Sequence, residues 1–289
     1  MSNSNKIWLF LGIFLVVLVL FGFLGIGSSD SFGANVAIIP VDGVIVTQSA
    51  GLFDAGAVSG QIVDKIQDAN NNAQVEVILI EMNSPGGSAV ASEEIVKAIK
   101  RSEKPVVSYV RDYGASGGYW VIAATDHIVA SPASIVGSVG VNGAHLGFAG
   151  LIDQYNISYR QFTAGQFKDI GSPFRDLTDE EQQRLDLKLN LLHDYFVGDV
   201  STLRNLTDLQ TEEIRKADFY LGLQGLELGI VDELGGQGEA LIYIENTYGI
   251  EANAFRMEES GGLVDLFAGV DASTLNPLLI EEFGGFSLR

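Results

Sequence analysis

Cysteine is absent from this chain of 289 residues. Its absence excludes a disulfide framework, thiol catalysis and lipid attachment to an N-terminal cysteine. Basic residues are also few, because 17 Lys and Arg stand against 37 Asp and Glu, which gives a net charge of −20. Nucleic-acid binding needs Lys and Arg to neutralise phosphates, so this composition argues against a nucleic-acid partner. With 47% hydrophobic residues and no internal repeat, the chain suits one sizeable α/β domain with appendages.

An uncharged apolar stretch occupies residues 7–26. A helix of this length spans about 30 Å, the thickness of a bilayer core. Lys6 favours a cytoplasmic N-terminus, residues 1–6, with the rest of the chain extracytoplasmic. The sequence therefore predicts a single-pass protein of the cell membrane, with lipid around residues 7–26 and a linker over residues 27–35. A signal peptide cleaved near Gly27 is the alternative.

Buried strands and amphipathic helices alternate in the middle of the chain. β-branched apolar runs predict strands at 75–82 and 105–110, and apolar residues at helical spacing predict helices at 58–70 and 90–101. This alternation implies parallel strands joined by helical crossovers, and hence an α/β layered domain.

The second half of the chain continues the pattern. It predicts short strands at 127–130 and 229–232 and a closing helix at 237–248. Thr178-Asp-Glu-Glu181 is a capping box that opens a long helix. The domain is expected over residues 36–248, and residues 249–289 are expected to be a partly ordered tail.

Ser116 lies in Gly114-Ala-Ser-Gly-Gly118, between a predicted buried strand and a predicted buried helix. Glycines permit a sharp turn there, which would hold the hydroxyl clear of the backbone. The N–H groups that open the next helix would then point toward the atom that the hydroxyl attacks. This pattern is typical of a serine nucleophile. A serine that merely caps the helix would have the same sequence.

A serine nucleophile needs a base. A Ser-His-Asp arrangement would have to use one of three histidines, of which His193 is the best placed in chain order. A lysine can serve instead if burial lowers its pKa, because a protonated amine has no lone pair. Lys168, in a glycine-flanked loop, is the candidate lysine, although such a residue is also typical of a solvated surface loop.

Acyl transfer also needs an oxyanion hole. Asn83-Ser-Pro-Gly-Gly87 follows a predicted buried strand and precedes a helix, where α/β sheets usually bind ligands. The N–H groups of Gly87 and Gly117 could point at one oxygen. A simple Pro-Gly turn remains the alternative.

Five motifs follow one another along the chain. They are Asn-Ser-Pro-Gly-Gly-Ser at 83–88, Ala-Ser-Gly-Gly-Tyr at 115–119, Gly-Ser-Val-Gly at 137–140, Phe-Lys-Asp-Ile-Gly-Ser-Pro-Phe-Arg at 167–175 and Leu-Gly-Ile-Val-Asp-Glu-Leu-Gly at 228–235. Together they resemble the signal peptide peptidase A family of membrane-bound Ser/Lys proteases. The resemblance covers about residues 36–248.

The resemblance implies a Clp-protease/crotonase-like fold of repeated ββα units. It also implies that Ser116 is the nucleophile, Lys168 the general base, and Gly87 and Gly117 the oxyanion donors. Ser138 matches a family serine that hydrogen-bonds the lysine. No metal or cofactor is needed. The chain lacks the tandem repeat of double-length members, so a homo-oligomeric ring or dome is expected.

The expected function is that of a membrane-anchored serine endopeptidase. By resemblance, its substrates are remnant signal peptides and other short apolar peptides. The alternatives are a Ser-His-Asp α/β-hydrolase and a non-catalytic membrane scaffold. One subunit or two neighbouring subunits could supply Ser116 and Lys168 to one site.

Overall fold

The computed structural model describes residues 33–48 and 56–257. The predicted membrane-spanning stretch 7–26, most of the predicted linker and the tail from residue 258 lie outside the described residues. No helix within the described ranges has both the length and the apolar character needed to cross a bilayer. Ala34–Met257 forms one folded unit.

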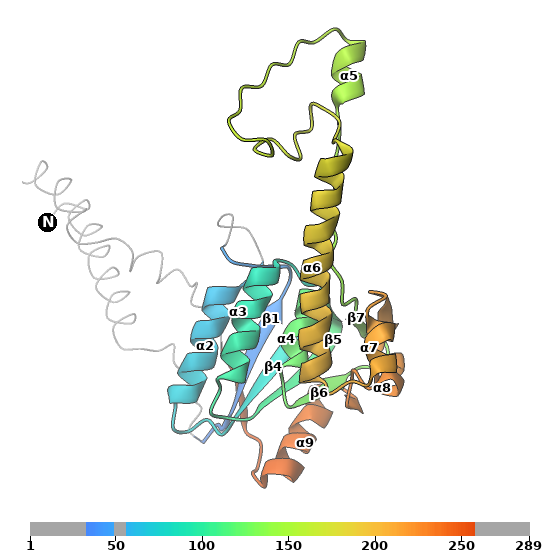
Figure 1. Ribbon diagram of the computed structural model, residues 1–289. Coiled ribbons are helices and arrows are strands. Elements are labelled where there is room, and N and C mark those ends of the chain that lie inside the picture. The colour runs from blue at the N-terminus through green and yellow to red at the C-terminus, as the bar shows by residue number, and fades with distance from the viewer. Residues whose placement is uncertain (1–32, 49–55, 258–289) are drawn as a thin grey trace, which may run out of the picture. The chain divides into compact units, whose positions relative to one another are not determined.

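A mixed but mainly parallel sheet lies at the centre of this unit (Figure 1). Its strand order is β10-β1-β4-β5-β6-β9, and β7 pairs with both β5 and β8. Only the β7–β8 pairing in this sheet is antiparallel among the described residues. The strands are β1 (Val36–Asp42), β4 (Val77–Ser84), β5 (Val106–Ala115), β6 (His127–Ala130), β7 (Ile135–Gly137), β8 (Phe219–Leu221), β9 (Glu233–Leu234) and β10 (Ala254–Arg256).

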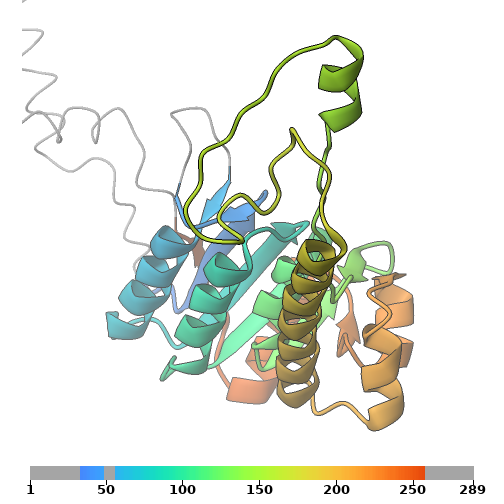
Figure 2. The ribbon, with the colours of Figure 1, turned by 45° about the horizontal axis from the view of Figure 1, so that its top comes forward.

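Helices cover both faces of the sheet (Figures 1 and 2). Alternate residues of a strand point to opposite faces, and both faces of β4 are apolar. Ile78 and Ile80 pack with α2 (Ser59–Asn71), α3 (Ala89–Lys100), α4 (Gly117–Ala123) and α6 (Asp179–Leu203). Val77 and Leu79 pack on the other face with α9 (Gln237–Tyr248). The predicted parallel α/β domain is therefore confirmed.

The structure differs from the predictions at two places near the C-terminal end of the domain. The strand predicted at 229–232 is wrong, because Gly229 takes a left-handed conformation that ends helix α8 (Gly222–Leu228), and β9 begins only at Glu233. The sheet also continues past residue 248, because β10 pairs in parallel with β1.

The loop that holds Gly87 is tied to a small second sheet. Strand β2 (Ile45–Val46) pairs with β3 (Ala57–Val58) rather than with β1. The Ile45 N–H donates to Gly86 O over 2.9 Å, and the Ser88 N–H donates to Ile45 O over 2.8 Å. Residues 84–88 are therefore held on one side by β2.

Residues 142–178 form a long excursion between β7 and α6, which we call the arm. Apart from the short helix α5 (Ala149–Gln154), most of the arm has no regular secondary structure. Figure 1 shows the arm beside the N-terminal end of α6, beyond the sheet. The predicted capping box of α6 is confirmed, because Thr178 and Glu181 bond reciprocally through side chain and backbone. A short helix, α7 (Asp208–Ile214), follows α6.

Candidate active site

Ser116 is the single residue between strand β5 and helix α4. Its backbone has φ 52° and ψ −124°, a conformation that is rare for residues other than glycine. The Ser116 N–H donates to Gly137 O over 2.8 Å, and its carbonyl accepts the Trp120 N–H over 3.0 Å. The Ser116 side chain makes no capping hydrogen bond. Ser116 thus has the strained strand–turn–helix position of a nucleophile elbow and does not act as a side-chain cap.

The loop at residues 84–88 lies directly against this turn. A Cβ atom built on Gly86 would lie 2.8 Å from the Ser116 Cβ and 2.7 Å from the Gly117 nitrogen. Neither the Gly87 N–H nor the Gly117 N–H donates a hydrogen bond to any residue that the structure describes. Two backbone donors that have no acceptor among the described residues therefore lie close to Ser116.

A pocket of about 270 Å³ opens beside Ser116. The Trp120 and Phe196 rings, with centroids 4.7 Å apart, form part of its wall. The indole Nε1 of Trp120 donates to Asp199 Oδ2 over 2.7 Å, which fixes the ring. Such a wall suits an apolar side chain. The lining residues are Gly87, Ala89, Ser116, Gly117, Trp120, Gly140, Val141, Asn142, Leu192 and Phe196.

Sequence reasoning missed this wall. Trp120 lies next to the Ala-Ser-Gly-Gly-Tyr motif, and Leu192 and Phe196 are four residues apart on one face of the long helix α6. Nothing in the sequence indicated that this face would meet the Ser116 turn.

Ser138 lies beside the Ser116 turn in space, and no hydrogen bond joins it to Lys168 among the described residues. It follows Gly137, whose carbonyl accepts the Ser116 N–H. Its own backbone has φ 52°, and its N–H donates to Asp218 O over 2.8 Å.

Lys168 lies on the arm, with its side chain exposed. Its backbone N–H donates to Gly165 O over 3.2 Å. Lys168 does not line the Ser116 pocket. The structure thus brings Ser116, Gly87 and Gly117 together, and within one chain it leaves Lys168 apart from them.

The three histidines are engaged elsewhere. His193 Nε2 lies 3.1 Å from Val139 O, and His145 Nε2 lies 3.0 Å from Ser172 O. His127 pairs with Glu233 over 3.2 Å and stacks on Tyr243. In the described ranges, no cluster of His, Asp or Glu could hold a metal ion.

The comparisons with known proteins identify the family of this chain. The sequence profile of peptidase family S49 matches residues 98–251, and the chain belongs to this family. The predicted resemblance to signal peptide peptidase A is thereby confirmed.

A putative protease of Methanocaldococcus jannaschii is 36% identical over 71% of this chain and 67% of its own length. A putative signal peptide peptidase SppA of Enterococcus faecium is 30% identical over 70% of this chain and 60% of its own length. Among solved structures, a membrane-bound stomatin-specific protease is 18% identical and covers 78% of this chain and 99% of its own, with a TM-score of 0.48.

Proposed function

We propose that this S49 peptidase is a membrane-anchored serine endopeptidase with Ser116 as its nucleophile and Lys168 as its general base. The observation that carries the proposal is the Ser116 turn. Its hydroxyl belongs to a strained strand-to-helix turn and borders a pocket, and two backbone N–H groups nearby have no acceptor within residues 33–48 and 56–257. The mainly parallel sheet beneath it is compatible with a Clp-protease/crotonase-like fold.

The proposed reaction is acyl transfer to serine. Neutral Lys168 takes the Ser116 proton while the Ser116 Oγ attacks the carbonyl carbon of the peptide bond. The Gly87 and Gly117 N–H groups donate to the oxyanion of the tetrahedral intermediate. Protonated Lys168 then gives its proton to the leaving amine as the C–N bond breaks. Water, deprotonated by Lys168, hydrolyses the acyl-enzyme and releases Ser116.

We further propose that one site takes Ser116 from one subunit and Lys168 from a neighbouring copy. Within one chain, Lys168 is exposed and makes no contact with the Ser116 pocket. The arm that carries it also exposes several large apolar side chains, which favours packing against another protein surface. These include Leu146, Tyr155, Ile157 and Phe162. Ser138 would then bond the incoming lysine amine.

The proposed substrates are remnant signal peptides and other short apolar peptides. The aromatic and aliphatic wall of the pocket supports an apolar side chain next to the cleaved bond. The apolar stretch at 7–26 would hold the domain at the outer face of the cell membrane, where such peptides remain after secretion.

The test uses the full-length protein in detergent and an apolar reporter peptide. Ser116→Ala and Lys168→Ala should each lose about two to four orders of magnitude in kcat/KM, the usual value of a positioned catalytic group. His193→Ala should keep near wild-type activity, which separates the lysine mechanism from a Ser-His-Asp triad. A Lys168→Ala enzyme that stays active would exclude Lys168 as the base.

Co-expression of Ser116→Ala and Lys168→Ala chains tests the shared site. Each site in a mixed ring draws its serine and its lysine from different subunits, so about one quarter of the sites should hold both. Recovery of about a quarter of the wild-type rate is the expected result, and a mixture as inactive as its parents would exclude the two-subunit site.

A fluorophosphonate probe separates an enzyme from a non-catalytic scaffold, because the scaffold would not be labelled at Ser116.

A further inference from the structure

The chain on both sides of Lys168 is tied to the beginning of helix α6. On the N-terminal side, the Arg184 guanidinium lies 3.9 Å from the centroid of the Phe167 ring. On the C-terminal side, the Asp169 carboxylate accepts a hydrogen bond from Arg175 Nε over 2.8 Å. Lys168 lies between these two attachments and is itself exposed.

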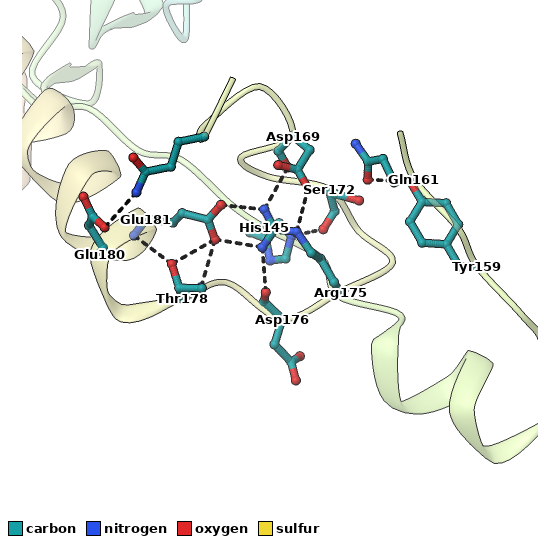
Figure 3. Close-up of polar contacts among 11 residues, drawn as sticks. His145, Tyr159, Gln161, Asp169, Ser172, Arg175, Asp176, Thr178, Glu180 and Glu181 are labelled. Atoms are coloured by element: carbon teal, nitrogen blue, oxygen red, sulfur yellow. Dashed lines mark hydrogen bonds and ion pairs between the residues drawn. The ribbon is translucent and has the colours of Figure 1, made fainter. Parts of the chain in front are cut away.

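Arg175 makes the C-terminal attachment to the helix (Figure 3). Its Nη1 donates to Glu181 Oε2 over 2.8 Å and its Nη2 to Glu181 Oε1 over 2.5 Å. The same guanidinium donates to the backbone carbonyls of Asp169 and Asp176. Because the guanidinium is planar with its donors in a fixed fork, these bonds define its orientation. Arg175 therefore ties the loop beside Lys168 to the first turn of α6.

Glu181 is a fixed point for this attachment. Its side chain is 5% exposed, and it also accepts the Thr178 N–H in the capping box over 2.9 Å. The hydrogen bonds from Arg175, and then that from Thr178, lower the pKa of Glu181 to about 2. Arg175 likewise lowers the pKa of Asp169. Both carboxylates are therefore ionised at neutral pH, and each holds Arg175 with a full charge.

Helix α6 continues from this attachment to the wall of the pocket. Glu181 lies in its first turn, and Leu192 and Phe196 further along the same helix line the Ser116 pocket. Because a helix is stiff over this length, α6 fixes the position of the Lys168 loop relative to the Ser116 pocket of the same chain.

We infer that Arg175 is a positioning residue for Lys168, because it bridges Asp169, the neighbour of Lys168, to Glu181 on α6. The inference rests on the proposed function, in which Lys168 is the general base. Arg175 does not touch the reacting atoms. Its role is to hold the lysine loop in the one orientation in which the amine can reach Ser116 of a neighbouring copy.

Loss of Arg175 should lower kcat without changing KM. Without the guanidinium, the Asp169 and Glu181 carboxylates would repel each other, and the loop would lose its C-terminal attachment to α6. Lys168 would then spend less time in the reactive orientation, while the Ser116 pocket, which binds the peptide, would be intact. A misplacement of about 1 Å can cost about 10²-fold in rate, so a loss of about 10- to 100-fold in kcat is expected.

The experiment compares Arg175→Gln with Arg215→Gln in the full-length enzyme. Arg215 is the matched control, because it also pairs with an acidic residue of α6, Asp194, and its side chain is 36% exposed against 30% for Arg175. Arg175→Gln should lower kcat about 10- to 100-fold with KM within about twofold, and Arg215→Gln should leave both constants unchanged. The double variant Arg175→Gln/Glu181→Gln should lose no more than Arg175→Gln alone, since both changes break one attachment.

Two results separate this inference from the proposed function. If Lys168→Ala is inactive and folded Arg175→Gln keeps kcat within twofold of the control, the positioning role is wrong and the dyad stands. If Lys168→Ala is fully active, the proposed function itself fails. Asp169→Asn provides the second variant in case Arg175→Gln does not fold, and wild-type kcat in folded Asp169→Asn would also overturn the inference.

Discussion

Gly87→Ala tests whether the Gly87 N–H stabilises the oxyanion. A methyl group on Gly87 would lie 2.1 Å from Ile45 O and 2.7 Å from Ile45 N, both backbone atoms. A backbone oxygen cannot rotate away as a side chain can, so residues 86–88 must separate from Ile45.

The structure sets the size of both expected effects. Separation breaks two hydrogen bonds, Ile45 N–H to Gly86 O and Ser88 N–H to Ile45 O. At about 0.5–1.5 kcal/mol each, their loss should lower the free energy of unfolding by about 1–3 kcal/mol. Such a loss leaves a domain of ordinary stability folded. The shifted loop moves the Gly87 N–H away from Ser116, and loss of one oxyanion donor costs about 10²–10³ in kcat.

The assay measures kcat and KM on the reporter peptide, with thermal unfolding in parallel. Gly60→Ala is the matched control, because Gly60 is an exposed residue of α2 with no atom within 4 Å of an added Cβ. The control should be as active as the wild type and more stable by up to about 1 kcal/mol, since alanine favours a helix. A folded Gly87→Ala enzyme with kcat within threefold of the wild type would refute the role of Gly87 as a donor.

Two further predictions concern the pocket wall and the α6 attachment. Trp120→Phe should lower the free energy of unfolding by about 1–3 kcal/mol, because Asp199 loses the indole donor. The larger pocket should also raise the relative kcat/KM for peptides with bulkier side chains at the cleaved bond. An unchanged substrate preference would show that Trp120 does not limit the size of the pocket. Because Arg175 holds the pKa of Glu181 at about 2, below its ordinary value of 4.5, the stabilisation by ionised Glu181 is complete above pH 4.5 and is lost as the pH falls toward 2. The melting temperature of the wild type should therefore drop more steeply over this interval than that of Glu181→Gln, and parallel curves would contradict the assignment.

Local sequence patterns predicted the strands and helices of the domain where apolar residues dominate a segment. The apolar runs that became β4 and β5 have buried side chains on both faces, which is why they are recognisable as continuous stretches. Short strands were harder to predict. Strand β8 has three residues with exposed Phe219 and Leu221, and its place is fixed by antiparallel pairing with β7 rather than by its own sequence.

In the candidate active site, too, the features set by local sequence were predictable and the others were not. The Ser116 turn was predictable because a sharp turn between a strand and a helix requires glycines next to it in the sequence. The strained backbone of Ser116 belongs to that turn. The aromatic wall was not predictable, because Phe196 lies 80 positions from Ser116 and reaches the pocket only through the packing of α6 on α4. Contacts of this kind depend on tertiary structure, which no local pattern encodes.

Lys168 shows that a sequence motif can identify a residue without explaining how that residue gains the property its role requires. The motif identifies the lysine, but a base needs a lowered pKa, and an exposed lysine in water is almost entirely protonated at neutral pH. In the part of the chain that the structure describes, the Lys168 side chain is exposed to water. If Lys168 is the base, a second surface must cover it, and the apolar side chains exposed along the arm suit that surface. Subunit assembly would then supply the desolvation on which the reaction depends, so conditions that dissociate the oligomer should abolish activity even where each chain stays folded. A chain fully active as a monomer would show that the lysine finds its dry environment in some other way.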